Sequence, residues 1–297
     1  MIATFVAFVF QSVAAQISGR LYPQRQDDLA WENDIVAFRI YGPATRAIGE
    51  RAFGNDIFFK HTGVGLILDE LYAKATDSAM LSKIDSLRKT DREAARRLEN
   101  EISYHIDHGK GMDCYAVGPT LGCGAAVLLE GDSICWQWAF EDARILENGP
   151  DRFRVVLKYP PVKVGNDSVR ETRVITLDKE SRLNFCEVSY DGLTHPVRIA
   201  AGFPRRGKPA TYTNPSEGIA AITDPTQGSG NGMALLGIYI PGGCDKAMEL
   251  GGHTLLVRTF QPGDTLRYYW GYAWDRTDID SMGQWLRYLE NFAGTHR

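Results

Sequence analysis

The sequence lacks the motifs that would place it in several common enzyme classes. It has no Gly-x-Ser-x-Gly nucleophile elbow and no phosphate-binding Gly-x-x-x-x-Gly-Lys-Ser/Thr loop. It also has no Gly-x-Gly-x-x-Gly fingerprint between a strand and a helix. These absences argue against a serine hydrolase of the elbow type, a P-loop nucleotide enzyme and a dinucleotide-binding oxidoreductase.

Cysteine is scarce, and its spacing carries no metal or redox signal. The five residues are Cys114, Cys123, Cys135, Cys186 and Cys244. Their number is odd and no pair has the Cys-x-x-Cys spacing of a zinc site. One disulfide is compatible with this count, but the apolar neighbours of residues such as Cys186 favour small buried thiols.

Long runs of like charge are also missing. The net charge of −4 argues against a nucleic-acid binder, so any anionic ligand requires a local Arg or Lys pocket. The 44% hydrophobic and 24% charged content is ordinary for a soluble globular protein. Because no linker or internal repeat interrupts the 297 residues, we expect one domain spanning residues 1–297.

The N-terminus supports two interpretations. Residues 2–13 are apolar, and Val13-Ala14-Ala15 resembles a signal-peptidase site, but no Lys or Arg precedes the run. The run is too short to span a bilayer, and its β-branched and aromatic residues are equally typical of a first strand. We favour a mature fragment without its native signal, and we expect no membrane span.

Strand-like segments separated by turn signals dominate the remainder of the chain. They are residues 35–41, 152–159, 171–177, 183–190, 233–240, 254–260 and 266–274. Several alternate polar and apolar side chains, as in Arg170 to Leu177, which is typical of half-buried antiparallel strands. Turn pairs such as Asp191-Gly192 fit hairpin connections. The sequence therefore predicts a mainly β protein.

Two segments have helical periodicity instead. Between Thr76 and Ile102, apolar residues recur at three, four or seven positions, and the capping-box pattern Thr90-Asp91-Arg92-Glu93 predicts a break near Lys89. Asp280 to Phe292 is a second helix candidate. Neither segment alternates with strands in a βαβ rhythm, so a parallel α/β sheet is disfavoured.

The segment from Tyr104 to Tyr115 concentrates the most reactive side chains. It contains two of the six histidines, and also two aspartates, one lysine and two tyrosines. We interpret it as a catalytic segment in which the reactive residues are Tyr104, His105, His108, Lys110 and Tyr115, with Asp107 and Asp113 oriented towards substrate or histidine. The alternative is a polar loop whose histidines bond to backbone carbonyls. A divalent metal would need a further ligand from elsewhere, so we predict no metal and no other cofactor.

Two aromatic motifs suggest sugar binding. Trp31-Glu32-Asn33 combines an indole with polar groups that can hold hydroxyls. In strand geometry Tyr268, Trp270, Tyr272 and Trp274 share one face. Such a stripe can line a carbohydrate cleft, although packing between two sheets is its commoner use.

These motifs together resemble a known family. Trp31-Glu32-Asn33-Asp34, the run Val36 to Pro43, the segment Tyr104–Tyr115 followed by Val117 to Gly122, and Tyr269-Trp270-Gly271 match, in order, the domain-of-unknown-function family 4861. The resemblance implies a large antiparallel β-sandwich of the galactose-mutarotase-like kind. It also implies a periplasmic or secreted protein of a polysaccharide-utilisation locus, similar to an oligosaccharide dehydratase of ulvan breakdown.

The implied reaction is the elimination of water from a uronic-acid oligosaccharide by general acid–base catalysis. A base must remove the C5 proton, an acid must protonate the leaving 4-hydroxyl, and a cation such as Lys110 or Arg39 must stabilise the charge. Further substrate contacts are expected from Trp31, Glu32, Asn33, Trp270 and Trp274. Two alternatives stay open: a glycoside hydrolase or mutarotase-like isomerase using paired carboxylates such as Glu32 and Asp113, and a glycan-binding module without activity.

Overall fold

Antiparallel pairing organises the protein into three sheets. The computed structural model describes residues 17–296. The first sheet contains, in spatial order, β1 (Ile17–Tyr22), β2 (Asp28–Asn33), β3 (Ala37–Ile40), β4 (Asp56–Lys60) and β5 (Gly111–Met112). The third sheet has the order β17 (Lys246–Leu250), β18 (His253–Phe260), β13 (Val197–Pro204), β6 (Ala126–Glu130) and β7 (Ser133–Cys135).

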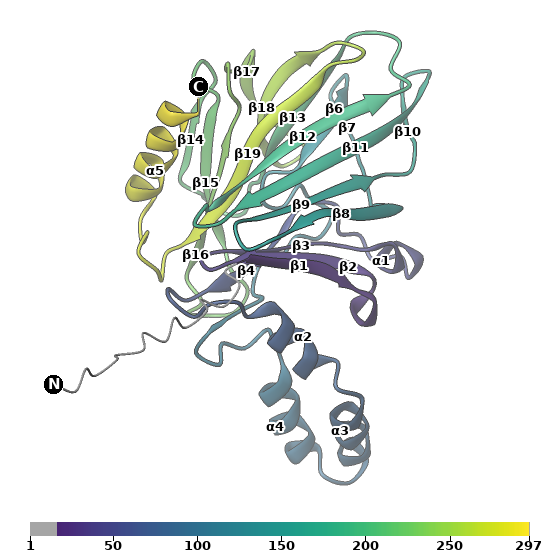
Figure 1. Ribbon diagram of the computed structural model, residues 1–297, viewed down its shortest axis with the longest axis vertical. Coiled ribbons are helices and arrows are strands. Elements are labelled where there is room, and N and C mark those ends of the chain that lie inside the picture. The colour runs from purple at the N-terminus through teal and green to yellow at the C-terminus, as the bar shows by residue number, and fades with distance from the viewer. Residues whose placement is uncertain (1–16, 297) are drawn as a thin grey trace, which may run out of the picture.

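The second sheet is the largest and runs across the whole sandwich (Figure 1). Its order is β14 (Thr211–Asn214), β15 (Ile219–Pro225), β16 (Met233–Tyr239), β19 (Thr265–Trp274), β12 (Leu183–Asp191), β11 (Asp167–Asp178), β9 (Arg152–Lys158) and β8 (Asp142–Asn148), with β10 (Val162–Val164) paired to β11. We call it the large sheet. The seven strand segments expected from residue 35 onward all fall on observed strands.

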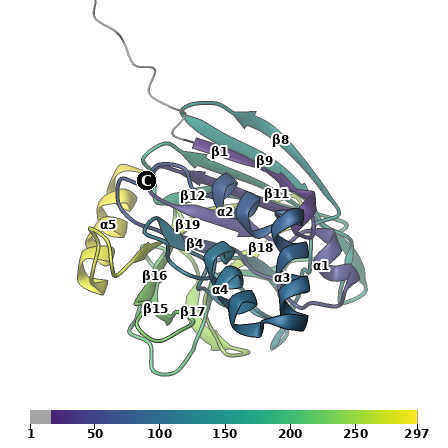
Figure 2. The same ribbon diagram turned by 90° about the horizontal axis from the view of Figure 1, so that it is seen from below.

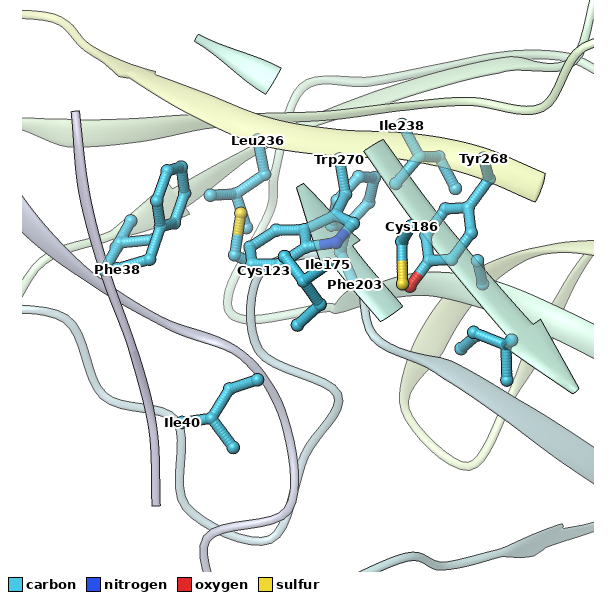
Figure 3. Packing of buried hydrophobic residues seen from close by; sticks show 14 of the residues in the cluster. Phe38, Ile40, Cys123, Ile175, Cys186, Phe203, Leu236, Ile238, Tyr268 and Trp270 are labelled. Atoms are coloured by element: carbon cyan, nitrogen blue, oxygen red, sulfur yellow. The ribbon is translucent and has the colours of Figure 1, made fainter. Parts of the chain in front are cut away.

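The inner face of the large sheet is covered by the two smaller sheets. A parallel bridge between Asn55 and Gly122 joins those sheets into one layer. Side chains from all three sheets form one core, in which Phe38 of the first sheet and Phe203 of the third pack with Trp270 of the large sheet (Figure 3). The prediction of a mainly β, antiparallel sandwich is confirmed.

The outer face of the large sheet carries the C-terminal helix α5 (Met282–Thr295), which lies on β15 and β16 (Figure 1). Trp285 and Leu289 of this helix pack on Leu235. The helix approaches so closely that a Cβ at Gly237 would lie 2.8 Å from both Trp285 and Leu289 side-chain atoms. The helix expected over residues 280–292 is thus confirmed.

The remaining helices are η1 (Pro23–Arg25), α1 (Pro43–Ala47), α2 (Leu68–Ala75), α3 (Ser78–Thr90) and α4 (Arg92–Ile102). Helices α2–α4 project from the sandwich beside the first sheet (Figure 1), and the view from below shows the three helices lying together (Figure 2). The predicted break falls at Asp91, whose carboxylate accepts the backbone N–H of Ala94 at 2.9 Å. Asp91, and not Thr90, is therefore the N-cap, and α2 was not predicted.

Two further expectations concern the termini and the thiols. The proposed first strand or leader over residues 2–13 lies outside the described residues. Within residues 17–296, no helix is both long and apolar enough to cross a membrane. All five cysteines carry free thiols, so the single disulfide that their number allowed does not form.

Candidate active site

The short strand β5 brings the Tyr104–Tyr115 segment to the end of β4. Gly111 and Met112 pair with Lys60 and Phe59, and the backbone N–H of His61 donates to the Lys110 carbonyl at 3.0 Å. Gly111 has a φ of +134°, and a Cβ there would lie 2.0 Å from the Phe59 carbonyl oxygen. Only glycine allows this approach, so Gly111 sets the position of the residues before it.

Asp107 is held by this turn and bonds to a histidine that is distant in sequence. Its Oδ1 accepts the backbone N–H groups of Gly109 at 2.8 Å and Gly111 at 3.2 Å. Its Oδ2 lies 2.6 Å from Nε2 of His61. Partial burial raises the pKa of Asp107, but the hydrogen bonds from His61 and the two glycines outweigh this and lower it overall. Asp107 is therefore a fixed carboxylate.

The contact with Asp107 assigns the tautomer of a neutral His61 ring. An ionised carboxylate only accepts hydrogen bonds, so Nε2 carries the proton that it shares with Asp107. Nδ1 then has a free lone pair, and no hydrogen-bond partner for it occurs among residues 17–296. The His61 side chain keeps 33% of its surface exposed. A carboxylate-oriented imidazole with a free nitrogen is suited to act as a general base.

Trp274, at the end of β19, supports this pair and a nearby cation. Its indole centroid lies 4.9 Å from the His61 ring, and the guanidinium carbon of Arg276 lies 5.8 Å from the indole centroid. Trp274 is itself buried and its Nε1 donates to the Asn231 carbonyl at 2.8 Å. The Trp274 indole therefore lies close to both His61 and Arg276.

Arg276 is an exposed cation without a carboxylate partner. No ion pair or hydrogen bond joins its guanidinium to any side chain of the described part of the chain. Arg276 still acts on the interior, because its charge opposes the effects of burial and of Asp113 and Asp107, which together raise the pKa of Cys114 to about 12. An unpaired, exposed guanidinium has free N–H donors that can bind a carboxylate.

Asp113 lies deeper, in a cluster around Arg39. Its Oδ2 accepts from Nη2 of Arg39 at 2.8 Å, and Asp56 binds the same guanidinium and the Tyr41 hydroxyl. Burial raises the pKa of Asp113 to about 6, although the charge of Arg39 opposes the shift. Arg39 is 2% exposed and is bound by Asp56 and Asp113, so it acts as a structural cation in this cluster; its expected contact with substrate stays a prediction.

His105 and His108 have the geometry of the polar-loop alternative. Nδ1 of His105 lies 2.8 Å from the Asp113 carbonyl oxygen, and Nε2 of His108 lies 3.2 Å from that of Ser103. His105 also borders a cavity of about 430 Å³ that is otherwise lined mainly by residues of α2, α3 and α4. Their catalytic roles stay predictions, and the structure does not place either beside His61.

The other reactive residues of the segment are engaged elsewhere. Lys110 forms an exposed ion pair with Glu70 at 2.5 Å, and the Tyr104 hydroxyl accepts from Nε of Arg25 at 2.8 Å. Tyr115 is buried and donates to Asp224 at 2.8 Å. Burial, and next the charge of Asp224, raise the pKa of Tyr115 well above its usual value. Tyr115 is therefore not suited to accept a proton at neutral pH.

Four residues from which sugar contacts are expected, Trp31, Glu32, Asn33 and Trp270, are buried in the structure. Trp31 and Trp270 are fully buried and lie edge to face at 6.2 Å, so neither presents an indole face to a ligand. Glu32 binds Lys60 at 2.7 Å and accepts the first N–H groups of α2, and Asn33 bonds to backbone groups on both sides. This burial gives no support to contacts of these four residues with a substrate, and their assignment to substrate binding stays a prediction. The aromatic stripe of β19 packs between the sheets, as its commoner use predicts.

A family comparison covers almost the whole chain. The family model described as Domain of unknown function (DUF4861) matches residues 6–296. The chain belongs to this family. The resemblance carried by the Trp31, Tyr104–Tyr115 and Tyr269 motifs is thus confirmed at the level of the family.

Individual relatives are distant. A curated protein of Formosa agariphila with the name Uncharacterized protein P7 is 26% identical over 290 residues, which are 92% of this chain and 66% of that protein. The chain therefore spans just under two thirds of that relative.

Two solved structures are weakly similar. A putative kojibiose phosphorylase from the human microbiome has 10% identity and a TM-score of 0.36 over 58% of this chain and 24% of that one. The GH36 alpha-galactosidase AgaB of Geobacillus stearothermophilus has 9% identity and a TM-score of 0.35 over 86% and 41%. TM-scores this low carry no argument about this chain.

His61 and Arg276 are the site residues that the motif analysis does not identify. Each lies just past the end of a strand, His61 after β4 and Arg276 after β19. The available signal is their position: a histidine and an arginine directly after apolar strands and next to turn residues. The sequence does not show that His61 and Asp107 are close, because the pairing of β5 with β4 brings them together.

Proposed function

We propose that this protein is a carbohydrate-active lyase, more narrowly a dehydratase, that acts on uronic-acid-containing oligosaccharides. The observation that carries the proposal is that His61, paired with Asp107, and the unpaired Arg276 both lie against the Trp274 indole. The family resemblance suggests the same chemistry. A periplasmic or secreted location remains part of this proposal.

The reaction needs a base and a cation at the positions where these residues lie. The C5 proton of a uronate is weakly acidic because its loss places negative charge on the adjacent carboxylate. Arg276 would bind that carboxylate through paired N–H donors and stabilise the added charge. The proposed reaction therefore uses the protein's own cation and no cofactor.

His61 would move the proton. Its Nδ1 takes the C5 proton, the electron pair of the C5–H bond forms the C4–C5 double bond, and the C4–O4 bond breaks. In a gluco-configured uronate the C5 hydrogen and O4 lie on the same face of the ring. The imidazolium can therefore return its proton to O4, which leaves as water. Asp107 stabilises the imidazolium between the two steps.

The alternative enzymes lack their proposed carboxylates. Glu32 is buried in an ion pair with Lys60, and Asp113 is buried against Arg39. Neither is a free carboxylate, so a hydrolase or isomerase built on this pair has no support. A binding module that uses the β19 stripe is equally unsupported, because Tyr268, Trp270, Tyr272 and Trp274 are buried.

The test measures the product. Incubation with glucuronate-ended oligosaccharides should increase the ultraviolet absorbance of an unsaturated uronate and lower the product mass by one water. His61→Ala should lower turnover by about 10²–10⁴-fold, the usual contribution of a general base, while the far-ultraviolet circular dichroism stays unchanged. His195→Ala, an exposed histidine whose Nδ1 lies 3.2 Å from Oδ2 of Asp167, is the matched control and should keep full turnover.

Two outcomes would contradict the proposal. A product heavier by one water, or of equal mass, would assign hydrolysis or isomerisation. Full turnover by a folded His61→Ala variant would remove the His61–Asp107 pair from the chemistry, even if elimination were observed.

A further inference from the structure

The outer face of the large sheet contains a hollow. None of the residues that line it belongs to the His61–Asp107 pair or contacts that pair. The hollow has a volume of about 600 Å³ and is lined by strands β9, β11, β12 and β19 and by helix α5. Figure 1 shows α5 along one side of this face. Strand β19 contributes side chains to both sides of the sheet. Tyr269 packs with α5 on the outer face, whereas Trp274 belongs to the inner core.

A continuous row of side chains crosses the hollow. Strand register places Arg154 beside Thr176, Thr176 beside Phe185, and Phe185 beside Tyr269. Residues paired in this way point to the same face, so the row runs from a cation to two aromatic rings. All four are partly exposed. The sheet therefore presents a platform that spans several sugar units in length.

Aromatic rings form the floor and one wall of the hollow. The Phe185 and Tyr269 rings are 5.0 Å apart, and Phe292 of α5 stands edge to face on Tyr269 at 4.9 Å. His296 stacks on Phe292 at 3.9 Å. Partly exposed aromatic faces next to polar groups bind the C–H faces of sugar rings.

The two arginines that line the hollow are paired with carboxylates. Arg152 binds Asp178 at 2.5 Å, and Arg154 lies 3.6 Å from Glu187. A paired cation still has N–H donors and a paired carboxylate still has lone pairs, so both can bind hydroxyl groups. Because Arg152 and Arg154 are already paired, they attract a further carboxylate less than the unpaired Arg276 does. The hollow is thus suited to uncharged rather than acidic sugars.

We infer that this hollow is a glycan-binding site for the neutral part of an oligosaccharide, separate from the His61–Asp107 pair. Phe185, Tyr269 and Phe292 would stack on sugar rings, while Arg154 and Glu187 would bind hydroxyls. The inference adds a binding function that does not depend on the proposed elimination.

The test is isothermal titration calorimetry with cellotetraose, xylotetraose and mannotetraose. At least one should bind saturably, and Phe185→Ala and Arg154→Gln should each weaken that binding about tenfold, the effect of one lost stacking or charge-assisted contact. Ile48→Ala, an exposed apolar residue that does not line the hollow, is the control and should bind as the parent protein does. Circular dichroism should show that each variant is folded.

Separate readouts distinguish this site from the proposed reaction. Arg276→Gln should leave the tetrasaccharide affinity unchanged, and Phe185→Ala should leave turnover of a glucuronate-ended disaccharide unchanged. The inference is overturned if none of the three tetrasaccharides binds, or if folded Phe185→Ala and Arg154→Gln proteins bind with the parent affinity. Neither result depends on whether the protein is a lyase.

Discussion

Arg276 carries a charge that no carboxylate of residues 17–296 neutralises, and the proposed reaction depends on it. Arg276→Gln keeps hydrogen-bond donors but removes the charge that would stabilise the developing carbanion. We expect kcat/KM for a glucuronate-ended oligosaccharide to fall by about 10²–10³-fold, as when one preorganised oxyanion donor is removed.

Arg258→Gln provides the matched control for that variant. Arg258 is also an exposed arginine on the sandwich, but it lies on β18 of the third sheet and not beside Trp274. Its kcat/KM should equal that of the parent protein. An equal loss in both variants would point to a general charge effect and would contradict the specific role of Arg276.

Asp28 is a buried carboxyl group whose ionisation works against folding. Its Oδ1 accepts the Gly42 N–H at 3.0 Å, and its Oδ2 lies 3.8 Å from Nη1 of Arg25 and 4.0 Å from Nε of Arg39. Burial raises its pKa from 3.8 to about 6, with Arg39 opposing the shift. The folded protein therefore holds a proton on Asp28 that the unfolded chain loses near pH 4.

A raised carboxyl pKa contributes stability at low pH that is lost as pH rises through about 6. A shift of about two pKa units corresponds to about 3 kcal/mol between pH 4 and pH 7. Asp28→Asn removes this titration, so its free energy of unfolding should fall less over that range than that of the parent. Urea denaturation at pH 4 and pH 7 measures the difference. An identical pH dependence in both proteins would assign the shift to another group.

Strand β5 is only two residues long, yet it positions Asp107. In Gly111→Ala the new Cβ would meet the Phe59 carbonyl oxygen at 2.0 Å with φ at +134°, so the β4–β5 pairing must open. We expect a loss of at least about 2 kcal/mol in the free energy of unfolding, together with most of the turnover.

Gly109→Ala separates backbone strain from the clash. Gly109 also has a positive φ, of +92°, but a Cβ there meets nothing within 4 Å. This variant should lose about 1 kcal/mol of stability and keep most of its turnover. Thermal unfolding and turnover together decide the question: equal losses in both variants would show that β5 does not position the site.

The strands of the large sheet are easier to predict from the sequence than the short helix α2. Strands such as β9, β11 and β12 alternate buried and exposed side chains, so their two-residue period is written directly in the sequence. Helix α2 has only eight residues, and Glu32, which is distant in sequence, caps its first N–H groups. A local pattern does not contain that contact, so α2 was not predicted.

The site was predictable in part for the same physical reason. The Tyr104–Tyr115 segment was singled out because its reactive side chains are contiguous, and one of them, Asp107, does reach the acid–base pair. Its partner His61 lies 46 residues earlier in the chain. Trp31 and Trp270 are buried, which the sequence does not reveal because a buried and an exposed indole look alike in a sequence. Only the packing of the three sheets distinguishes them.

The three sheets meet at one buried charged residue, Arg173 of β11. It forms an ion pair with Glu171 at 2.6 Å, reaches Oδ1 of Asn55 beside the first sheet at 3.4 Å, and reaches the Ala126 carbonyl of the third sheet at 3.4 Å. Glu171 also accepts from the Tyr190 hydroxyl at 3.0 Å. Arg173 is 3% exposed, so its charge is compensated by these contacts and not by solvent.

Arg173→Met should therefore destabilise the whole sandwich and not one sheet. Loss of the guanidinium leaves Glu171 as a buried carboxylate without a cation, which costs about 3–5 kcal/mol. The double variant Glu171→Gln, Arg173→Met removes that charge and keeps an acceptor for Tyr190, so it should be more stable than the single variant by at least about 1 kcal/mol. Chemical denaturation followed by tryptophan fluorescence and by circular dichroism should give coincident transitions, because all three sheets share the core around Arg173. A double variant less stable than Arg173→Met would show that the polar contacts of Arg173 to Asn55 and Ala126, and not the charge of Glu171, hold the layers together.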